Sequence, residues 1–155
     1  MTVLIMVNAL DSMIIREIRA EDAEDISRIQ ATITKSPPTI DFRHIIEEQV
    51  GNFENASFVA EVDDHVVGYM ISYILLGGFG LEKSAWISTL GVDPRFMGQG
   101  IGKRLAEEIL NVYRKKGIHS IYTSVRWDSV DLLSFFKTLG FDRSHFINLR
   151  KRLDR

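Results

Sequence analysis

Cysteine is absent from this chain of 155 residues, and histidine occurs only four times. Without cysteine there are no disulfides, no thiolate metal ligands and no cysteine nucleophile. The histidines are scattered and none has the spacing of a metal-ligand pair, so we expect no metal site. No apolar run is long enough to span a membrane, and the apolar stretch that ends at Leu10 lacks the preceding basic residues of a secretory signal. We therefore predict a cytoplasmic protein that does not bind a membrane.

Proline is also rare, with three residues, and no repeat or low-complexity stretch divides the chain. The length and a hydrophobic fraction of 45% are sufficient for one domain with a substantial core. A net charge of -2 gives no reason to expect nucleic-acid binding. The first interpretable pattern begins at Met13, so we expect an N-terminal extension of unknown role over residues 1–12 and one domain over residues 13–155.

The periodicity of the apolar residues predicts an α/β protein with the order β-α-α-β-β-β-α-β-α-β. Strands are expected at residues 13–19, 58–62, 65–74, 84–92 and 119–125, with a final strand or pair at 141–142 and 146–153. Helices are expected at residues 22–34, 41–50, 100–116 and 130–139. The Asp63-Asp64 pair predicts a hairpin turn between the second and third strands.

Three alternating glycines, Gly98, Gly100 and Gly102, separate the strand at 84–92 from the helix at 100–116. Glycine permits positive φ angles and a close approach of the backbone, and the N-terminus of the helix favours negative charge. The segment therefore predicts a site for a phosphorylated cofactor. It is not a P-loop, since Met97 stands where the first glycine belongs and Arg104 stands where Ser or Thr belongs. It is not a dinucleotide-binding loop either, because its spacing is G-x-G-x-G and it lies in the middle of the chain.

Two motifs resemble the GNAT superfamily of N-acetyltransferases. The first is Met97-Gly98-Gln99-Gly100-Ile101-Gly102, which falls on the superfamily's acetyl-CoA loop. The second is Phe136-Lys137-Thr138-Leu139-Gly140-Phe141, an aromatic residue shortly before Gly-Phe at the end of a helix. The resemblance covers roughly residues 13–150. It implies a single-domain fold with a central, mostly antiparallel mixed sheet, a splay between the fourth and fifth strands, and flanking helices.

The same resemblance implies which residues hold acetyl-CoA as co-substrate. The strand residues Leu90 to Val92 would bind the pantetheine arm, and the loop residues Gly98 to Lys103 would bind the pyrophosphate. The full set of implied cofactor-binding residues is Leu90, Gly91, Val92, Met97, Gly98, Gln99, Gly100, Ile101, Gly102, Lys103, Ser129 and Phe136. Three of these depart from the family pattern. Met97 replaces Arg or Gln, Ser129 replaces a frequent asparagine, and Phe136 replaces the tyrosine that protonates the leaving thiolate in many relatives.

Acetyl transfer to an amine needs a neutral nucleophile, stabilisation of an oxyanion and a proton for the leaving sulfur. The resemblance implies that the backbone N–H of Val92 is the oxyanion donor. The predicted strand at 84–92 carries no carboxylate, so Glu82 just before it is the candidate base, acting through water, against the alternative of a solvated loop charge. Ser88 and Ser124 are candidates for ordering that water, against the alternative of ordinary strand residues.

The aromatic residues Tyr73, Phe79, Trp86 and Trp127 suggest an aromatic acceptor pocket, with core packing as the alternative. Gly77-Gly78-Phe79-Gly80 is either a mobile flap over the acceptor or an ordinary turn.

We therefore predict an N-acetyltransferase that transfers an acetyl group directly from acetyl-CoA to an amine, since no cysteine is present to carry it. The acceptor is a small amine or a protein amino group, and the last strands are candidates for a homodimer interface. The alternative is a non-catalytic acyl-CoA-binding or sensory module on the same fold, which the departures at Met97 and Phe136 motivate. A nucleotide-binding α/β protein is a third hypothesis.

Overall fold

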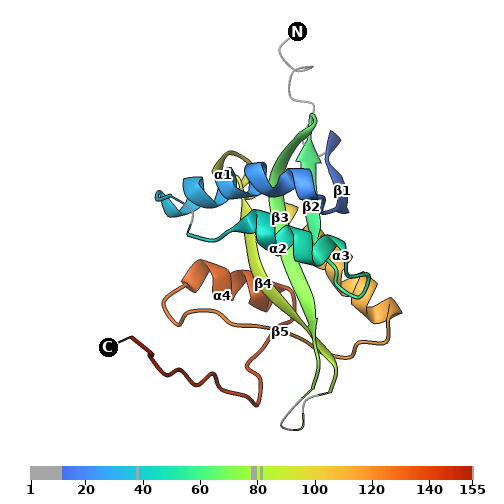
Figure 1. The fold of residues 1–155 in the computed structure, drawn as a ribbon, viewed down its shortest axis with the longest axis vertical. Coiled ribbons are helices and arrows are strands. Elements are labelled where there is room, and N and C mark those ends of the chain that lie inside the picture. Colours follow the sequence, from blue (N-terminus) through green and yellow to red (C-terminus); the bar gives the residue numbers. More distant parts are fainter. Residues whose placement is uncertain (1–11, 38, 78–79, 81, 155) are drawn as a thin grey trace. The chain divides into compact units, whose positions relative to one another are not determined.

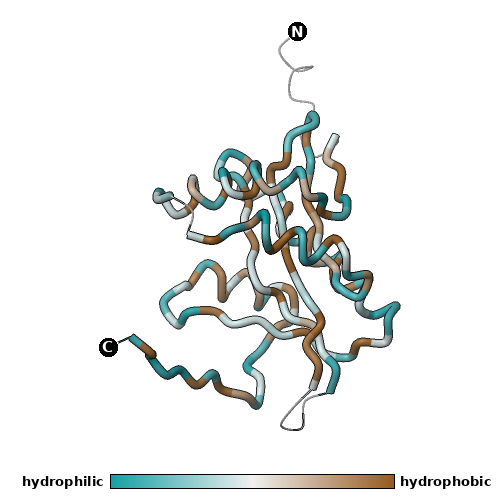
Figure 2. Tube along the Cα trace, in the orientation of Figure 1, coloured by the Kyte–Doolittle hydropathy of each residue, from teal (hydrophilic) through white to brown (hydrophobic). Residues whose placement is uncertain are grey.

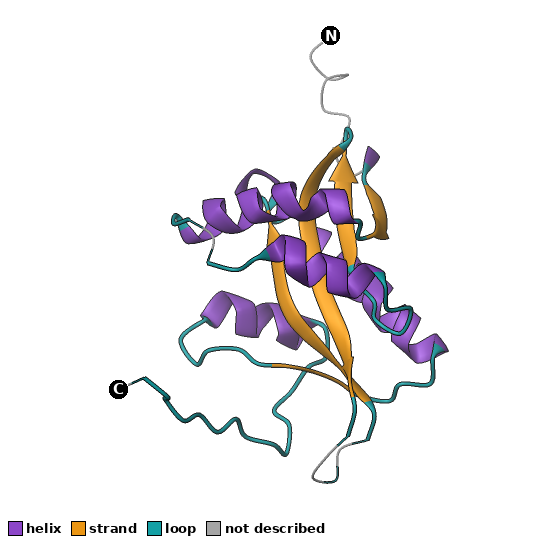
Figure 3. Ribbon diagram, viewed as in Figure 1, coloured by secondary structure: helices purple, strands orange, loops and turns teal. Residues whose placement is uncertain are grey.

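The computed structural model describes residues 12–37, 39–77, 80 and 82–154, and it divides into two compact units that meet in the sequence at Thr123 and Ser124. The first unit holds the sheet and three of the four α-helices of the described residues, whereas the second holds one helix and the C-terminal segment (Figure 3). Each unit is described by itself. No helix within the described residues is long and apolar enough to cross a membrane.

The first unit is built on a five-stranded sheet in the order β1-β2-β3-β4-β5 (Figure 1). Its strands are β1 (Ile14–Glu17), β2 (Phe58–Val62), β3 (His65–Leu75), β4 (Ser84–Val92) and β5 (Ile121–Thr123). All pairs are antiparallel except β4 with β5, which are parallel. The predicted mixed, mostly antiparallel sheet is therefore confirmed. So is the hairpin, since Asp63 and Asp64 have φ angles of 49° and 63°, as a tight turn between twisted strands requires.

The four α-helices lie within two residues of their predicted ends. They are α1 (Ala23–Thr34), α2 (Phe42–Val50), α3 (Ile101–Lys115) and α4 (Val130–Thr138). In the first unit, α1 and α2 lie together on one face of the sheet (Figure 1). Helix α3 packs on the other face, because Gly68 contacts α3 while its neighbour Tyr69 contacts α2, and successive strand residues point to opposite faces.

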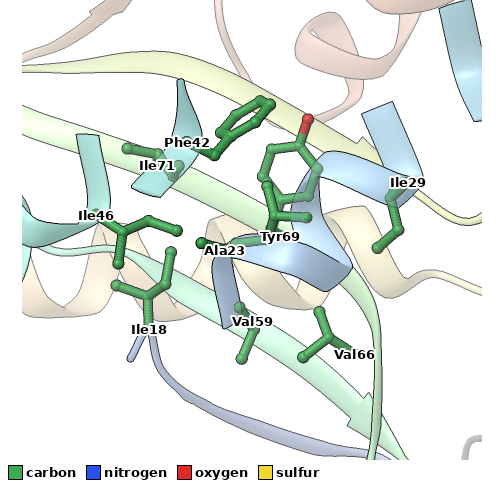
Figure 4. Close-up of a cluster of buried hydrophobic side chains, with 10 residues drawn as sticks. Ile18, Ala23, Ile29, Phe42, Ile46, Val59, Val66, Tyr69 and Ile71 are labelled. Carbon is green, nitrogen blue, oxygen red and sulfur yellow. The ribbon is translucent and has the colours of Figure 1, made fainter. Parts of the chain in front are cut away.

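The core beneath α1 and α2 is a cluster of fully or nearly fully buried apolar residues (Figure 4). Tyr69 lies at its centre with no exposed surface, edge-on to Phe42 at 5.7 Å between ring centroids. The Tyr69 hydroxyl donates to Gln30 Oε1 of α1 at 2.8 Å. The helical spacing predicts a buried stripe on each helix, and Ile26 and Ile46 are buried as expected. Ile33, which the same spacing places on the inner face of α1, is 37% exposed because it lies in the last turn of the helix. Full burial of each such side chain contributes about 1.5–3 kcal/mol.

Two predictions about the end of the chain are wrong. Strand β5 ends at Thr123 rather than at residue 125, and no strand occurs among the described residues from 139 to 154. The segment 146–153 mixes apolar and charged residues (Figure 2), and Ile147, Leu149 and Leu153 are 84–89% exposed. A strand also needs a neighbouring strand to pair with its backbone groups, and none of the five described strands pairs with this segment.

Candidate active site

The edge of β4 that faces away from β3 has no neighbouring strand along its second half. The N–H of Asp93 donates to the carbonyl of Val67 at 2.8 Å, and hydrogen-bonded pairs alternate along an antiparallel ladder. The backbone groups of Thr89 and Gly91 therefore bond to β3, whereas those of Leu90 and Val92 point to the opposite edge. Strand β5 pairs with this edge only along residues 85–87. Within the sheet described, the N–H and C=O groups of Leu90 and Val92 consequently have no strand partner.

A β-bulge marks the point where β4 leaves β5. Ile71 pairs with Thr89, but the next residue of β3, Ser72, pairs with Ile87, so Ser88 is an extra residue in β4. The Ser88 hydroxyl donates to the Ile71 carbonyl at 3.2 Å. Ile87, immediately before the bulge, forms the last pair with β5. Because a bulge bends its strand and increases the local twist, Ser88 accounts for the splay between the two strands.

The glycine loop presents unpaired backbone donors at the N-terminus of α3. Gly98 and Gly100 both have a φ of +79°, a conformation that other residues rarely adopt. Gly100 is the N-cap, and the first intrahelical bond runs from Arg104 N–H to its carbonyl at 3.1 Å. The N–H groups of Ile101 and the two residues after it therefore have no partner within the helix, nor a side-chain cap. A Cβ atom at Gly98 or Gly100 would meet nothing within 4 Å, so no other part of the described chain covers the loop on that side of these two glycines. Unpaired N–H groups at the start of a helix are the kind of donor that binds an anion.

The loop is held beside the β4 edge by close packing of α3 on the sheet. A Cβ atom on Gly68 would lie 2.9 Å from Cγ2 of Ile101, so only glycine lets the first turn of α3 approach this closely. Gly68 is the cross-strand partner of Val92. The contact between Gly68 and Ile101 therefore positions both the free N–H of Val92 and the backbone donors at the start of α3.

Asp93 joins β4 to the glycine loop and is 4% exposed. Its carboxylate accepts from the Arg95 N–H at 3.0 Å and from the Arg95 guanidinium at 2.9 Å, and Arg28 of α1 lies 3.9 Å away. The Arg95 hydrogen bonds hold the pKa of Asp93 below its usual value. Arg95 is consequently engaged by Asp93, whereas Lys103 and Arg104 are exposed beside the loop.

The predicted catalytic residues fall in both units. Val92 lies on the free edge of β4, and Glu82 is an exposed residue before β4 whose carbonyl accepts from the Ser84 hydroxyl at 2.7 Å. Ser124 opens the second unit, and its hydroxyl accepts from Asn148 Nδ2 at 2.8 Å.

The remaining predicted cofactor residues are Met97, which is 53% exposed in the glycine loop, and Ser129 and Phe136 of the second unit. Ser129 is the N-cap of α4, but its side chain makes no cap bond. Phe136 is 4% exposed and packs edge to face against Phe141 at 5.1 Å.

The structure brings together only two of the four predicted acceptor aromatics. Tyr73 and Trp86 are cross-strand partners, whereas Trp127 belongs to the second unit and Phe79, with most of its glycine-rich segment, lies outside the described residues. The pairing adds a residue to this set, because Trp86 also pairs with Tyr122 of β5 and their rings stack at 5.3 Å. Only the register between β4 and β5 places Tyr122 there, so a linear pattern does not reveal it.

No group of three or more potential metal-ligating residues occurs among the described residues. A model of the acetyltransferase (GNAT) family matches residues 17–141. The chain therefore belongs to this family, and its class is that of an acetyltransferase.

Several solved structures share the fold. An aminoglycoside acetyltransferase from an uncultured soil metagenomic sample has a TM-score of 0.77 and 19% identity, over 93% of this chain and 98% of that one. The aminoglycoside N-acetyltransferase AAC(6')-Iy in complex with CoA has a TM-score of 0.76 and 18% identity, over 92% and 95%. A transcriptional regulator from Bacillus halodurans has a TM-score of 0.75 and 22% identity, over 91% and 99%.

Proposed function

We propose that this protein transfers the acetyl group of acetyl-CoA directly to an amine. Two sets of backbone donors in the first unit carry the proposal. One is the free edge of β4, and the other is the uncapped start of α3. The first suits the amides of a pantetheine arm, which pair like a strand, and the second suits a pyrophosphate. The open space at Gly98 and Gly100 is consistent with this fit.

Acetyl-CoA, when bound, supplies a thioester that an amine attacks, so that an N–C bond forms, the C–S bond breaks and CoA leaves as a thiolate that takes its proton from water. The chain contributes orientation through the backbone of Leu90 and Val92. The N–H of Val92 donates to the carbonyl oxygen on which negative charge develops, and a fixed donor of this kind contributes about 10²–10³ in rate. Glu82, through water, receives the proton that the amine loses.

The acceptor that we propose is an amine-bearing small molecule or a protein amino group. The small-molecule class is supported by the aminoglycoside acetyltransferases among the structural neighbours. We further propose that two copies associate through the exposed apolar residues of segment 146–153, and that the protein is cytoplasmic.

A second candidate function is a non-catalytic sensor of acyl-CoA on the same fold. One observation favours it: Phe136 is buried and has no ionisable group, so it cannot protonate a leaving thiolate. The release of free CoA in the presence of amines distinguishes an enzyme from a sensor.

The test is thermal unfolding with acetyl-CoA, CoA, ATP and NAD titrated separately. Acetyl-CoA at a hundred times its Kd stabilises the native state by about 2.7 kcal/mol. For a chain of this size each kcal/mol raises Tm by about 2–4 °C. A saturable rise with the CoA species followed by CoA release with an amine supports the enzyme. No rise with either CoA species contradicts both functions.

A further inference from the structure

Thr89 lies on the part of β4 that has a free edge, on the face of the sheet that α1 and α2 cover. Of the four β4 residues after the bulge, 89–92, only Thr89 has a side chain that can form a hydrogen bond. Thr89 pairs with Ile71, and Gly91 pairs with Tyr69. Directly opposed residues point to the same face, so Thr89 is a diagonal neighbour of Tyr69, which belongs to the core beneath the two helices (Figure 4).

A chain of hydrogen bonds sets the orientation of the Thr89 hydroxyl. The Tyr69 hydroxyl donates its only proton to Gln30 Oε1 of α1 at 2.8 Å, so toward Thr89 it can only accept. Burial raises the pKa of Tyr69, and the side-chain hydrogen bond with Thr89 opposes this rise, as a donor to the phenol oxygen does. The proton of the Thr89 hydroxyl is therefore engaged, and the free lone pair of its oxygen remains as an acceptor.

Only the two ends of this chain are accessible to a bound molecule. Tyr69 has no exposed surface, whereas Thr89 and Gln30 are half-buried. The Tyr69 hydroxyl would lie 3.0 Å from a Cβ atom on Gly91, so the chain of hydrogen bonds lies against the residue that directly precedes Val92. The Thr89 oxygen is therefore an accessible acceptor close to the proposed oxyanion donor.

The distance from Thr89 to the N–H of Val92 suits the reacting groups. Thr89 precedes Gly91 by two positions, about 7 Å along a strand, and the N–H of Val92 follows Gly91 directly. A hydrogen bond of about 2.9 Å at each end and a separation of about 3–3.5 Å between the reacting atoms span about 9 Å. The opposite face of the sheet is closed here, because the first turn of α3 packs on Gly68, the partner of Val92. An amine therefore reaches the thioester from the face that carries Thr89.

We propose that Thr89 holds the attacking amine: its hydroxyl oxygen accepts one N–H of the neutral amine and so turns the nitrogen lone pair toward the thioester carbon. The proposal rests on the proposed acetyl transfer, and it makes Thr89 a catalytic residue that contacts the acceptor. Tyr69 and Gln30 are positioning residues, which keep the Thr89 proton turned away from the amine. A proton of the amine leaves through water toward Glu82 as the N–C bond forms, so Thr89 itself neither gains nor loses a proton.

Steady-state kinetics test the role of the Thr89 hydroxyl. CoA release is measured at saturating acetyl-CoA with sisomicin, spermidine, lysine and a tetrapeptide with a free N-terminus, and the variants are compared with the amine that wild-type protein uses best. Thr89→Val is expected to lower kcat about 10²-fold, the loss that a misplaced reactant produces. Thr89→Ser keeps the hydroxyl and is expected to retain kcat within about threefold. The acetyl-CoA thermal shift should be the same in both variants as in wild type, since the backbone donors remain.

A double-mutant cycle separates the positioning role of Tyr69 from its part in the core. Tyr69→Phe is expected to lower kcat about three- to tenfold in wild type and to have no further effect in Thr89→Val protein, because the hydroxyl that it positions is already absent. Tyr113→Phe is the matched control. Tyr113 is 2% exposed and its hydroxyl accepts from the Ala56 N–H at 3.0 Å, so this change also removes a buried hydrogen bond but should leave kcat unchanged.

The outcomes separate the two levels of inference. If wild-type protein shows the acetyl-CoA shift and releases CoA with an amine, but Thr89→Val keeps its kcat, the assignment of Thr89 fails and the proposed function stands. An equal loss of kcat in Thr89→Val and Thr89→Ser also overturns the assignment, because the hydroxyl is then not the cause. If wild-type protein shows no shift, or a shift without CoA release for any amine, the proposed acetyl transfer itself fails.

Discussion

Substitution of Gly91 by alanine tests most directly whether β4 packs as closely against Tyr69 as the structure shows. A Cβ atom at this position would lie 2.8 Å from Cε1 of Tyr69, 3.0 Å from its hydroxyl and 3.0 Å from Cδ1 of Ile33. The clash is not relieved by a simple rotation, because the Tyr69 ring is fully buried and lies edge-on to Phe42. Its hydroxyl is also held by Gln30 at 2.8 Å.

An extra methyl group in a well-packed core costs about 1–3 kcal/mol. Since both the ring and the hydroxyl of Tyr69 must move, we expect Gly91→Ala to lower the free energy of unfolding by about 2 kcal/mol and Tm by about 4–8 °C. The displacement also moves Leu90 and Val92, so the affinity for acetyl-CoA should fall with the stability.

Urea unfolding followed by circular dichroism measures the first effect, and the acetyl-CoA thermal shift measures the second. Gly51→Ala is the matched control, because a Cβ atom there meets nothing within 4 Å. A Gly91→Ala protein within 0.5 kcal/mol of wild type, on the usual scale of surface substitutions, would refute the packing argument.

Three further predictions concern the glycine loop and two buried carboxylates. Gly100→Ala should destabilise the fold by about 1–2 kcal/mol and weaken acetyl-CoA binding, because alanine is strained at a φ of +79°. Gly102→Ala, inside α3, should leave the free energy of unfolding unchanged or raise it by up to about 1 kcal/mol. Urea unfolding compares the Gly100→Ala and Gly102→Ala proteins. Asp22→Ala should cost about 3 kcal/mol in the same assay, since Asp22 is 4% exposed and binds the Arg16 guanidinium at 2.8 Å and 2.9 Å. The hydrogen bonds from Arg95 lower the pKa of Asp93 in the folded state. The ionised Asp93 carboxylate therefore stabilises the fold at pH values above the pKa of an unfolded aspartate, about 3.9. This stabilisation is lost as the pH falls through the lowered pKa of the folded state. The difference in unfolding free energy between wild type and Asp93→Asn should therefore shrink below about pH 4, and a constant difference would contradict the ion pair.

Local patterns in the sequence were sufficient for most of the fold. The stripe of Ile101, Leu105 and Ile109 predicts α3, and the three residues are buried as expected. The Asp63-Asp64 turn is likewise confirmed, because the backbone of a two-residue hairpin depends on the residues within it. The glycine loop was also recognisable, since the need for positive φ angles is a property of the glycines themselves.

The failures occurred where a structure depends on a partner. Segment 146–153 was predicted as a strand from its apolar residues, yet no described strand pairs with it, and composition contains no information about pairing. The extra residue Ser88 in β4 is similar, because a bulge exists only relative to the opposite strand.

The sequence by itself therefore determined the elements, the hairpin and the presence of a glycine loop suited to phosphate. Only the tertiary structure decided that the N–H of Val92 points to a free edge, that Ile101 packs on Gly68, and that Tyr122 stacks on Trp86. The physical reason is the range of the interactions. Elements follow from periodicity between near neighbours, whereas a site is made by strand register and packing between residues that lie far apart in the chain.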